Sequence, residues 1–316
     1  MSILRKKGKE KLSFRRMNSK VANQDFKRWK KICLRCLNEN QSISEKLDKF
    51  YRLISVYFFY EVTDPHVSNI IREALADPSL PCPSKPVPAA AYSRKNRGCI
   101  VIFLKHFKEH ILKRTDIADF GSYIKNGLFE EFCHLVEQEG DSTEVPDSYI
   151  KLGELYQRNN LLSYGNQILL RLDTDRNHYT VYLMMLRAYP NDWVKRYSKY
   201  FHQTPEQYEQ QYEQWKNNIP ISIVYARLVT DYFRMVNLLY VAKKAYKEPI
   251  SVENKKLLDS LIVSGKKDVE GKRHIIDRDM GQMALSLIDC INEPIFKTPK
   301  IFFSVMLDLW KNLKLV

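Results

Sequence analysis

Apolar residues recur at intervals of three and four along almost the whole chain, and this helical period constrains the fold more than any other feature. Strand patterns are almost absent. Residues 100–104 resemble a short buried strand, but the apolar pattern continues through Phe107 and Ile111 and favours a helix. Only 10 glycines occur in 316 residues, which disfavours turn-rich β architectures. The sequence therefore predicts an all-α protein of about a dozen helices in two lobes.

Two early helices have recognisable starts. Ser42 and Glu45 form a capping box ahead of an apolar pattern that continues through Phe58, so one helix is predicted over this stretch. Asp64 and Pro65 provide a cap and a proline at the first helical position of the next helix. These signals extend the helical prediction through the N-terminal part of the chain.

Later boundaries are marked in the same way. Thr204 and Gln207 flank a proline and predict a capped helix start, and residues 222–246 carry the longest continuous helical pattern. Gly265 is a favourable helix terminator, and the residues after it are highly charged. A charged loop is therefore predicted over 265–278.

Charge and proline divide the chain into three predicted parts. Residues 1–22 form a basic disordered arm, 23–139 an N-terminal helical lobe, and 140–316 a C-terminal helical lobe. Five of the 13 prolines fall in residues 77–98, which predicts a proline-rich loop inside the first lobe.

One segment of the C-terminal lobe has a repeat-like pattern. Tyr149, Leu152, Gly153 and Tyr156 resemble the first helix of a tetratricopeptide repeat (TPR), with Tyr in place of Trp. The next expected repeat fits poorly, and a single repeat cannot bury its own apolar face. A TPR-like helix hairpin and an ordinary helical bundle both remain open.

The strongest charge feature is at the start of the chain. Residues 5–31 contain 12 Lys or Arg residues against Glu10 and Asp25, which gives this stretch +10 of the total net charge of +14. The remainder of the chain is nearly neutral by comparison. Such a basic segment is typical of a nuclear import signal, of a segment that contacts nucleic acid, or of a disordered tail that is simply solvated.

Import is predicted from two patterns. The run from Lys6 to Lys9 has three bases in four residues, and Arg15-Arg16 followed after ten residues by a basic run over 27–31 resembles a bipartite signal. A mitochondrial presequence is a minor alternative, because the stretch is basic and poor in acids, and a cytoplasmic location is another. The sequence thus predicts a nuclear protein that binds an import receptor.

Nucleic-acid contact is predicted for the arm and for two later clusters, because each Lys or Arg beside a phosphate releases condensed counterions. The candidate residues are Arg5, Lys6, Lys7, Lys9, Lys11, Arg15, Arg16, Lys27, Arg28, Lys30, Lys31, Arg94, Lys95, Arg97, Lys266, Lys267, Lys272 and Arg273.

Two patterns suggest metal chemistry. His106-x-x-Glu109-His110 fits a zinc-peptidase spacing, but lysines crowd the same helix and no third ligand is identifiable. Cys33-x-x-Cys36 suits a zinc or redox pair, but both cysteines lie on the apolar side of their predicted helix. Whether either pair binds metal is left open, and no cofactor and no catalytic residue is predicted.

These features together predict a non-enzymatic, nuclear, helical protein that binds RNA or DNA, with little sequence preference, through its basic arm. The alternative is a nuclear α-helical scaffold that joins a protein complex, with the arm serving only for import. No uncharged apolar stretch reaches the length of a bilayer span, so no membrane contact is expected.

Overall fold

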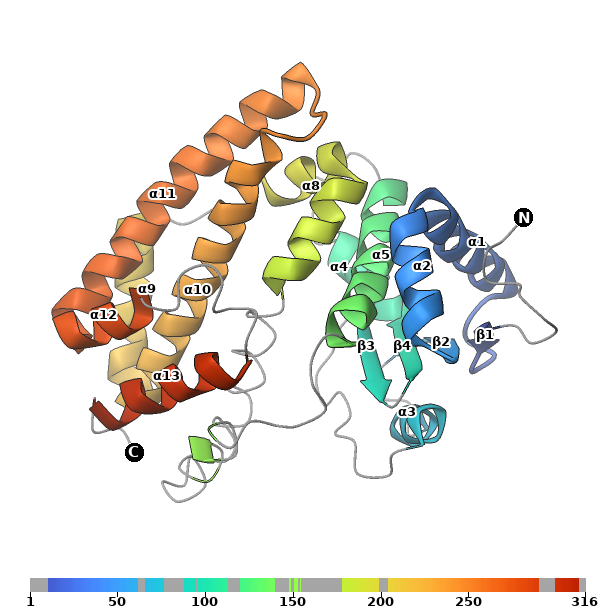
Figure 1. Cartoon of the computed structure of the whole chain (residues 1–316), viewed down its shortest axis with the longest axis horizontal. Coiled ribbons are helices and arrows are strands. Elements are labelled where there is room, and N and C mark those ends of the chain that lie inside the picture. Colours follow the sequence, from blue (N-terminus) through green and yellow to red (C-terminus); the bar gives the residue numbers. More distant parts are fainter. Residues whose placement is uncertain are drawn as a thin grey trace. The chain divides into compact units, whose positions relative to one another are not determined.

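The computed structural model describes residues 11–61, 66–76, 88–94, 96–112, 120–139, 148, 151–152, 154, 178–198, 204–289 and 299–312 (Figure 1). The chain divides into two compact units, Met1–Asp141 and Ser142–Val316, and each is described by itself. Most of the described residues are helical, and the first unit also contains a sheet. Within the described residues, no helix combines the length and the apolar character that crossing a bilayer requires.

The first unit alternates strands and helices. Its described elements are β1 (Leu12–Arg16), α1 (Asn23–Glu39), α2 (Gln41–Phe50), β2 (Leu53–Phe59), α3 (Val67–Leu75), β3 (Ala89–Arg94), β4 (Arg97–Phe103), α4 (Leu104–Leu112) and α5 (Phe120–Glu139).

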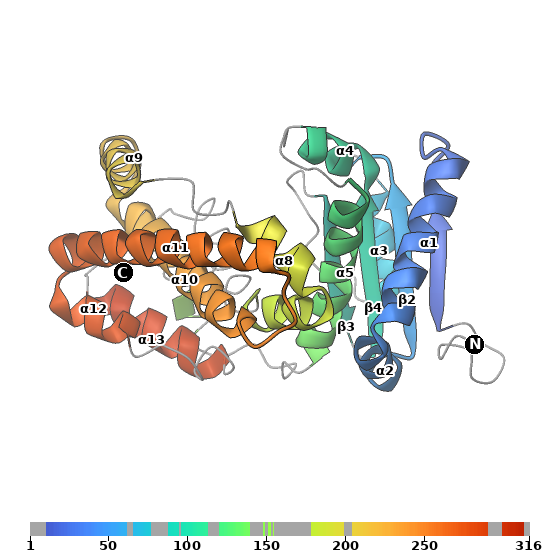
Figure 2. The same cartoon turned by 90° about the horizontal axis from the view of Figure 1, so that it is seen from above.

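The four strands form one mixed sheet in the order β1-β2-β4-β3. β1, β2 and β4 are parallel neighbours, while β3 runs antiparallel to β4 and joins it through a tight hairpin at Asn96, which has a left-handed backbone with φ of 60°. α1, α2 and α5 pack together on one face, and Figure 2 shows α5 running along the strands. α3 packs on the other face, against β3 and β4. β1 and β3 are therefore the two edges of the sheet.

The prediction of an all-α fold is wrong for the first unit. β2 and β4 are buried along nearly their whole length because helices cover both faces of the sheet. Strands of this kind are continuous apolar runs without the alternation that identifies a half-exposed strand. The apolar run over 53–59 therefore fits the predicted helix as well as a strand, but the helix, α2, ends at Phe50 and the run forms β2.

Two predicted irregular segments also contain strands. β1 lies within the arm predicted to be disordered, so disorder does not hold for Leu12–Arg16, while residues 1–10 lie outside the described residues. Likewise β3 and the start of β4 lie within the predicted proline-rich loop, of which 77–87 are outside the described residues. Both short strands are stabilised by pairing with a buried neighbour, a contact that local sequence does not reveal.

The second unit is helical throughout its described residues. Its labelled helices are α8 (Pro190–Tyr197), α9 (Pro205–Asn218), α10 (Ile221–Ala245), α11 (Val252–Met280), α12 (Gln282–Asp289) and α13 (Pro299–Asn312), and residues 178–188 form a further helical segment. α10 and α11 lie side by side as a long hairpin (Figure 1). Helices α9 to α13 share one apolar core, which includes Tyr212, Phe233, Ile276 and Trp310.

Two predicted helices of this unit are confirmed. α9 begins at Pro205 with the expected capping box, in which Thr204 accepts from the Gln207 amide and the Gln207 side chain accepts from the Thr204 amide. The long pattern over 222–246 corresponds to α10.

The predicted loop over 265–278 is wrong, because α11 continues unbroken to Met280. Glycine inside a helix costs about 1 kcal/mol relative to alanine. Here Leu261, Ile262, Ile275 and Ile276 bury their side chains on both sides of Gly265, which outweighs that cost.

The TPR-like segment falls largely outside the described residues. Only positions 151, 152 and 154 of the pattern are described, and Leu152 packs into the common core of the second unit. Nothing in the described residues supports a TPR array, and the helix hairpin stays a prediction.

Candidate nucleic-acid interface

α1 separates apolar from basic residues on its two sides. Trp29, Cys33, Cys36 and Leu37 are buried against the rest of the first unit. The opposite side exposes lysines, because residues three and four apart share one helix face. Lys27, Lys30 and Lys31 are all exposed there.

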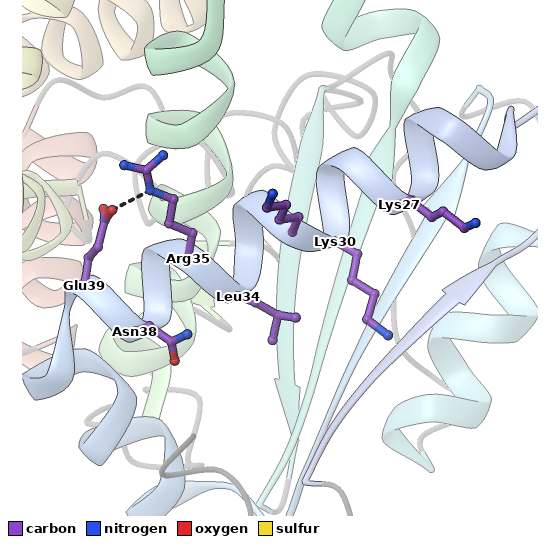
Figure 3. Close-up of a pocket in the computed structure, with 7 residues that line it drawn as sticks. Lys27, Lys30, Leu34, Arg35, Asn38 and Glu39 are labelled. Atoms are coloured by element: carbon purple, nitrogen blue, oxygen red, sulfur yellow. Dashed lines mark hydrogen bonds and ion pairs between the residues drawn. The ribbon is translucent and has the colours of Figure 1, made fainter. Parts of the chain in front are cut away.

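These lysines border a shallow hollow. Figure 3 shows Lys27 and Lys30 extending from the same side of α1 as Leu34. The hollow is lined entirely by residues of α1: Lys27, Lys30, Lys31, Leu34, Arg35, Asn38 and Glu39. It is a feature of an exposed helix face rather than an enclosed pocket.

Aromatic contacts fix α1 over the edge of the sheet. The Lys30 ammonium lies 5.3 Å from the centroid of the Phe14 ring on β1. Phe14 stacks on Phe58 of β2 with centroids 6.5 Å apart, and Phe26 of α1 meets the same Phe58 ring edge-on at 5.4 Å. The basic side of α1 is thereby held beside β1.

β1 brings two arginines to this edge, and both Arg15 and Arg16 are exposed. Successive side chains of a strand point to opposite faces, so Arg16 shares the face of Phe14 and α1, while Arg15 points to the other face. We define the basic face as Lys27, Lys30 and Lys31 of α1 together with Arg16 of β1. Its members come from both halves of the bipartite pattern.

Three other lysines of the first unit form ion pairs with carboxylates. Lys11 pairs with Asp48 at 2.6 Å, Lys108 with Asp25 at 2.8 Å, and Lys105 with Glu61 at 3.0 Å. The hydrogen bond between Lys105 and Glu61 lowers the pKa of the carboxyl group and raises the pKa of the amine.

The basic face differs in this respect. Within the described residues, no carboxylate forms an ion pair with Lys27, Lys30 or Lys31. Arg35, further along the helix, is bonded to Glu39 at 2.6 Å (Figure 3). Three cations of α1 therefore remain available to an anion from solution, whereas the predicted site residue Lys11 is already paired.

The second predicted basic cluster comprises Arg94, Lys95 and Arg97, and its two described residues are not close to the basic face. Arg94 and Arg97 face each other across the β3–β4 turn, and Lys95 lies outside the described residues. Arg97 is in register with Leu53 and Arg16 with Phe58, five residues further along β2. At about 3.3 Å per residue this is about 17 Å along the strand direction, so the hairpin arginines are not part of the basic face.

The basic cluster predicted in the second unit, Lys266, Lys267, Lys272 and Arg273, lies on helix α11, and its members differ in exposure and in partners. Lys266 and Lys267 are exposed, while Lys272 is buried and paired with Asp268 at 2.5 Å. Arg273 forms a two-contact ion pair with Asp289, at 2.6 and 3.3 Å.

Because this stretch is a helix rather than a loop, its cations point in different directions. The ammonium of Lys272 is enclosed and paired with Asp268 in this structure, so it does not face solvent, where phosphate could reach it. Arg5, Lys6, Lys7 and Lys9 lie outside the described residues, and Arg28 is exposed on α1 beside the basic face.

The two sequence patterns that suggest metal binding lie on helices α1 and α4. Cys33 and Cys36 are fully buried, and burial raises the pKa of the Cys33 thiol well above its ordinary value, as it does for Cys133. Buried protonated thiols of this kind act as small apolar side chains. His106 lies 3.6 Å from Glu109 on α4, and the side chain of His110 is outside the described residues.

Sequence reasoning missed the contribution of β1. Leu12 and Phe14 alternate with Ser13 and Arg15, which is the period of a strand, but five residues inside a highly basic stretch gave too short a pattern. Phe14 is the residue that connects the basic cluster of β1 with that of α1.

Comparison of the chain with protein-family models, curated proteins and solved structures finds no match.

Proposed function

We propose that this chain is a non-enzymatic nuclear protein that binds the phosphate backbone of nucleic acid through the basic face. One observation carries the proposal. Lys27, Lys30 and Lys31 share one exposed side of α1, have no carboxylate partner within the described residues, and stand beside Arg16.

Unpaired cations on a rigid element are suited to this role. Lys27 and Lys31 are four residues apart, or about 6 Å along the helix axis. Phosphates of a nucleic-acid strand repeat at a comparable spacing, and each neutralised phosphate releases counterions and adds affinity. Lysine ammonium groups act as point charges and do not read base edges by paired hydrogen bonds. We therefore expect binding with little sequence preference.

The nuclear part of the proposal rests on the basic stretches. Arg15, Arg16 and the basic run over 27–31 lie in a strand and a helix, and residues 6–9 lie outside the described residues. No residue is assigned a catalytic role. The protein-scaffold alternative gains support only from the edge of β1, which is treated in the next subsection.

The test compares two sets of charge-removing substitutions. Changing Lys27, Lys30 and Lys31 to Gln removes three charges from the basic face, and changing Lys243, Lys255 and Lys256 to Gln removes three exposed charges from the second unit. Binding of a fluorescent 20-nucleotide DNA or RNA duplex is measured over a range of salt concentrations. Each phosphate contact contributes about 0.9 to the slope of log K against log salt, so the first variant should lose up to about 2.7.

Equal slopes for the two variants would overturn the proposal, because a general charge effect acts wherever the lysines stand. Equal binding by both variants and the unchanged protein would do so too. Substitution is the appropriate perturbation here. Deleting residues 1–22 would remove β1 and with it one edge strand of the sheet.

A further inference from the structure

Among the described residues, one backbone edge of β1 has no strand paired with it. The Ile54 amide donates to the Lys11 carbonyl at 2.7 Å, and the Met17 amide donates to the Phe58 carbonyl at 3.0 Å. In a parallel ladder, alternate residues of a strand direct both backbone groups to the same neighbour. Lys11, Met17 and the odd-numbered residues between them thus bond to β2.

The even-numbered residues of β1 point the other way. Leu12, Phe14 and Arg16 direct their N–H and C=O groups away from β2, and no strand pairs with that side among the described residues. Three consecutive outward residues provide up to six hydrogen-bonding groups in a straight row. An added strand uses such a row in β-augmentation.

The charges beside this edge restrict what can occupy it. Arg15 and Arg16 are exposed on the strand, and Lys30 lies over Phe14. Cationic side chains on an edge strand prevent pairing with another copy of the same strand, because like charges would meet. They favour a strand whose side chains are acidic.

We infer that β1 binds an extended acidic peptide segment of a partner protein, which pairs with Leu12, Phe14 and Arg16 as a fifth strand. The backbone pairing would be nearly independent of the peptide's sequence, and acidic side chains would meet Arg16 and Lys30 on the α1 face and Arg15 on the other. This inference goes beyond nucleic-acid binding and stands without it, since it depends on the strand edge.

The probe is a synthetic peptide of nine residues with alternating glutamate and valine and with blocked ends. A matched peptide carries N-methyl groups on alternate amides, so its charge is unchanged but it cannot donate along one edge. Binding to the full-length protein is measured by fluorescence anisotropy, and exchange of the Leu12, Phe14 and Arg16 amides is followed by NMR. Neither measurement requires an altered protein, so misfolding of a variant does not affect the result.

We expect the N-methylated peptide to bind at least about tenfold more weakly, because several backbone hydrogen bonds are lost together. The three outward amides should exchange more slowly only with the unmodified peptide. Equal binding of both peptides, absence of binding, or unchanged exchange at these amides would each overturn the inference.

Changing Lys27, Lys30 and Lys31 to Gln separates this inference from the proposed function. The substitutions should reduce duplex binding and leave the discrimination between the two peptides in place. A tight oligonucleotide complex combined with equal affinity for both peptides would overturn this inference and leave the proposed function standing. Peptide discrimination without oligonucleotide binding would leave the strand edge as the only functional surface of the two.

Discussion

Lys272 and Asp268 form a buried ion pair one turn apart on α11, and this pair allows a quantitative test of the second unit. The two residues are only 3% and 5% exposed, and Nζ lies 2.5 Å from Oδ1. The ammonium also lies 3.8 Å from the centroid of the Tyr208 ring on α9. Burial lowers the pKa of Lys272 and raises the pKa of Asp268. Each charge therefore depends on the other.

Changing Lys272 to Met should destabilise the second unit by about 3–4 kcal/mol at pH 7, since it leaves a buried carboxylate without its cation. The loss has an upper bound, because Asp268 can instead take up a proton. Its ordinary pKa is 3.8. Protonation at pH 7 therefore costs at most about 4.4 kcal/mol, at about 1.36 kcal/mol per pH unit.

The sign of the pH dependence follows from the direction of the shift. A carboxyl whose pKa is higher in the folded than in the unfolded protein favours folding below its ordinary pKa and loses this contribution as the pH rises. Removing Lys272 raises the folded pKa of Asp268 further. The destabilisation should therefore shrink by up to about 1.4 kcal/mol per pH unit on acidification, to at most about 1.6 kcal/mol at pH 5.

Changing Asp268 to Asn should give the opposite pH dependence. Lys272 is then left without its partner, and its loss of a proton becomes easier as the pH rises, so the destabilisation should decrease toward alkaline pH. We expect a smaller loss of about 2 kcal/mol at pH 7, because the Tyr208 ring remains and Asp231, which accepts from the Tyr208 hydroxyl at 3.3 Å, also stabilises the ammonium. The double variant with Leu at 268 and Met at 272 should be close to the unchanged protein in stability.

The assay is urea unfolding of the full-length protein between pH 5 and pH 8, read by hydrogen exchange of peptides from α11. Exchange reports the second unit separately, which matters because a chain with two units need not unfold in one step. Losses that are equal at pH 5 and pH 7 would refute the reasoning, as would a double variant less stable than either single variant. Oligonucleotide binding should be unchanged in all three variants, because the enclosed ammonium cannot reach phosphate.

Further predictions concern packing, acid stability and import. Changing Gly98 to Val should cost about 1–3 kcal/mol in thermal unfolding, because a Cβ there would lie 3.1 Å from the Leu135 side chain. Burial raises the pKa of Asp279, but hydrogen bonds, first that from Arg278, overcome this and lower it to about 2. Its contribution is therefore present above pH 3.8 and lost as the pH falls through 2, so the Asn variant should lose about 1 kcal/mol at pH 7 and clearly less at pH 2. Changing the bases within residues 6–9 to Ala should make a tagged protein cytoplasmic in fluorescence images, and unchanged nuclear accumulation would contradict this.

The helices of the second unit were the most predictable part of the fold, because their signals are local. Thr204 and Gln207 formed the expected cap of α9, and the long pattern over 222–246 became α10. Gly265 misled the prediction since its local preference is weaker than the apolar contacts along the rest of α11. A helix boundary depends both on the local preference of its residues and on the apolar contacts that the helix makes in the fold, and only the local preference is visible in the sequence.

The sheet was less predictable for a physical reason. The run over 53–59 is apolar on every side because β2 has strands on both edges and helices over both faces. A short buried strand and a buried helix segment have the same composition. The sequence over 100–104 resembles a strand, and this segment is β4 as far as Phe103. The apolar residues of α4 follow immediately, and for that reason the sequence pattern favours a helix instead.

The sequence predicts which part of the chain is rich in basic residues, but it does not predict which of these residues lie together on an exposed surface. A count of charges identifies the first 31 residues, yet it cannot show that Lys11 and Lys108 have carboxylate partners 37 and 83 residues away. Nor can it show that the two halves of the bipartite pattern are joined through Phe14. Availability of a cation is a property of its neighbours in space.

The folded position of these clusters also bears on how import would work. A receptor that takes residues 15–31 as an extended chain would have to withdraw Trp29, which is 2% exposed, from the core of the first unit. Losing a buried tryptophan costs about 3–5 kcal/mol, which reduces the apparent affinity for such a receptor by about two to four orders of magnitude. Residues 6–9 carry no such cost from Trp29, because they precede β1. Import and nucleic-acid binding would then use different basic clusters, and substitutions at Lys27, Lys30 and Lys31 should weaken duplex binding while nuclear accumulation persists.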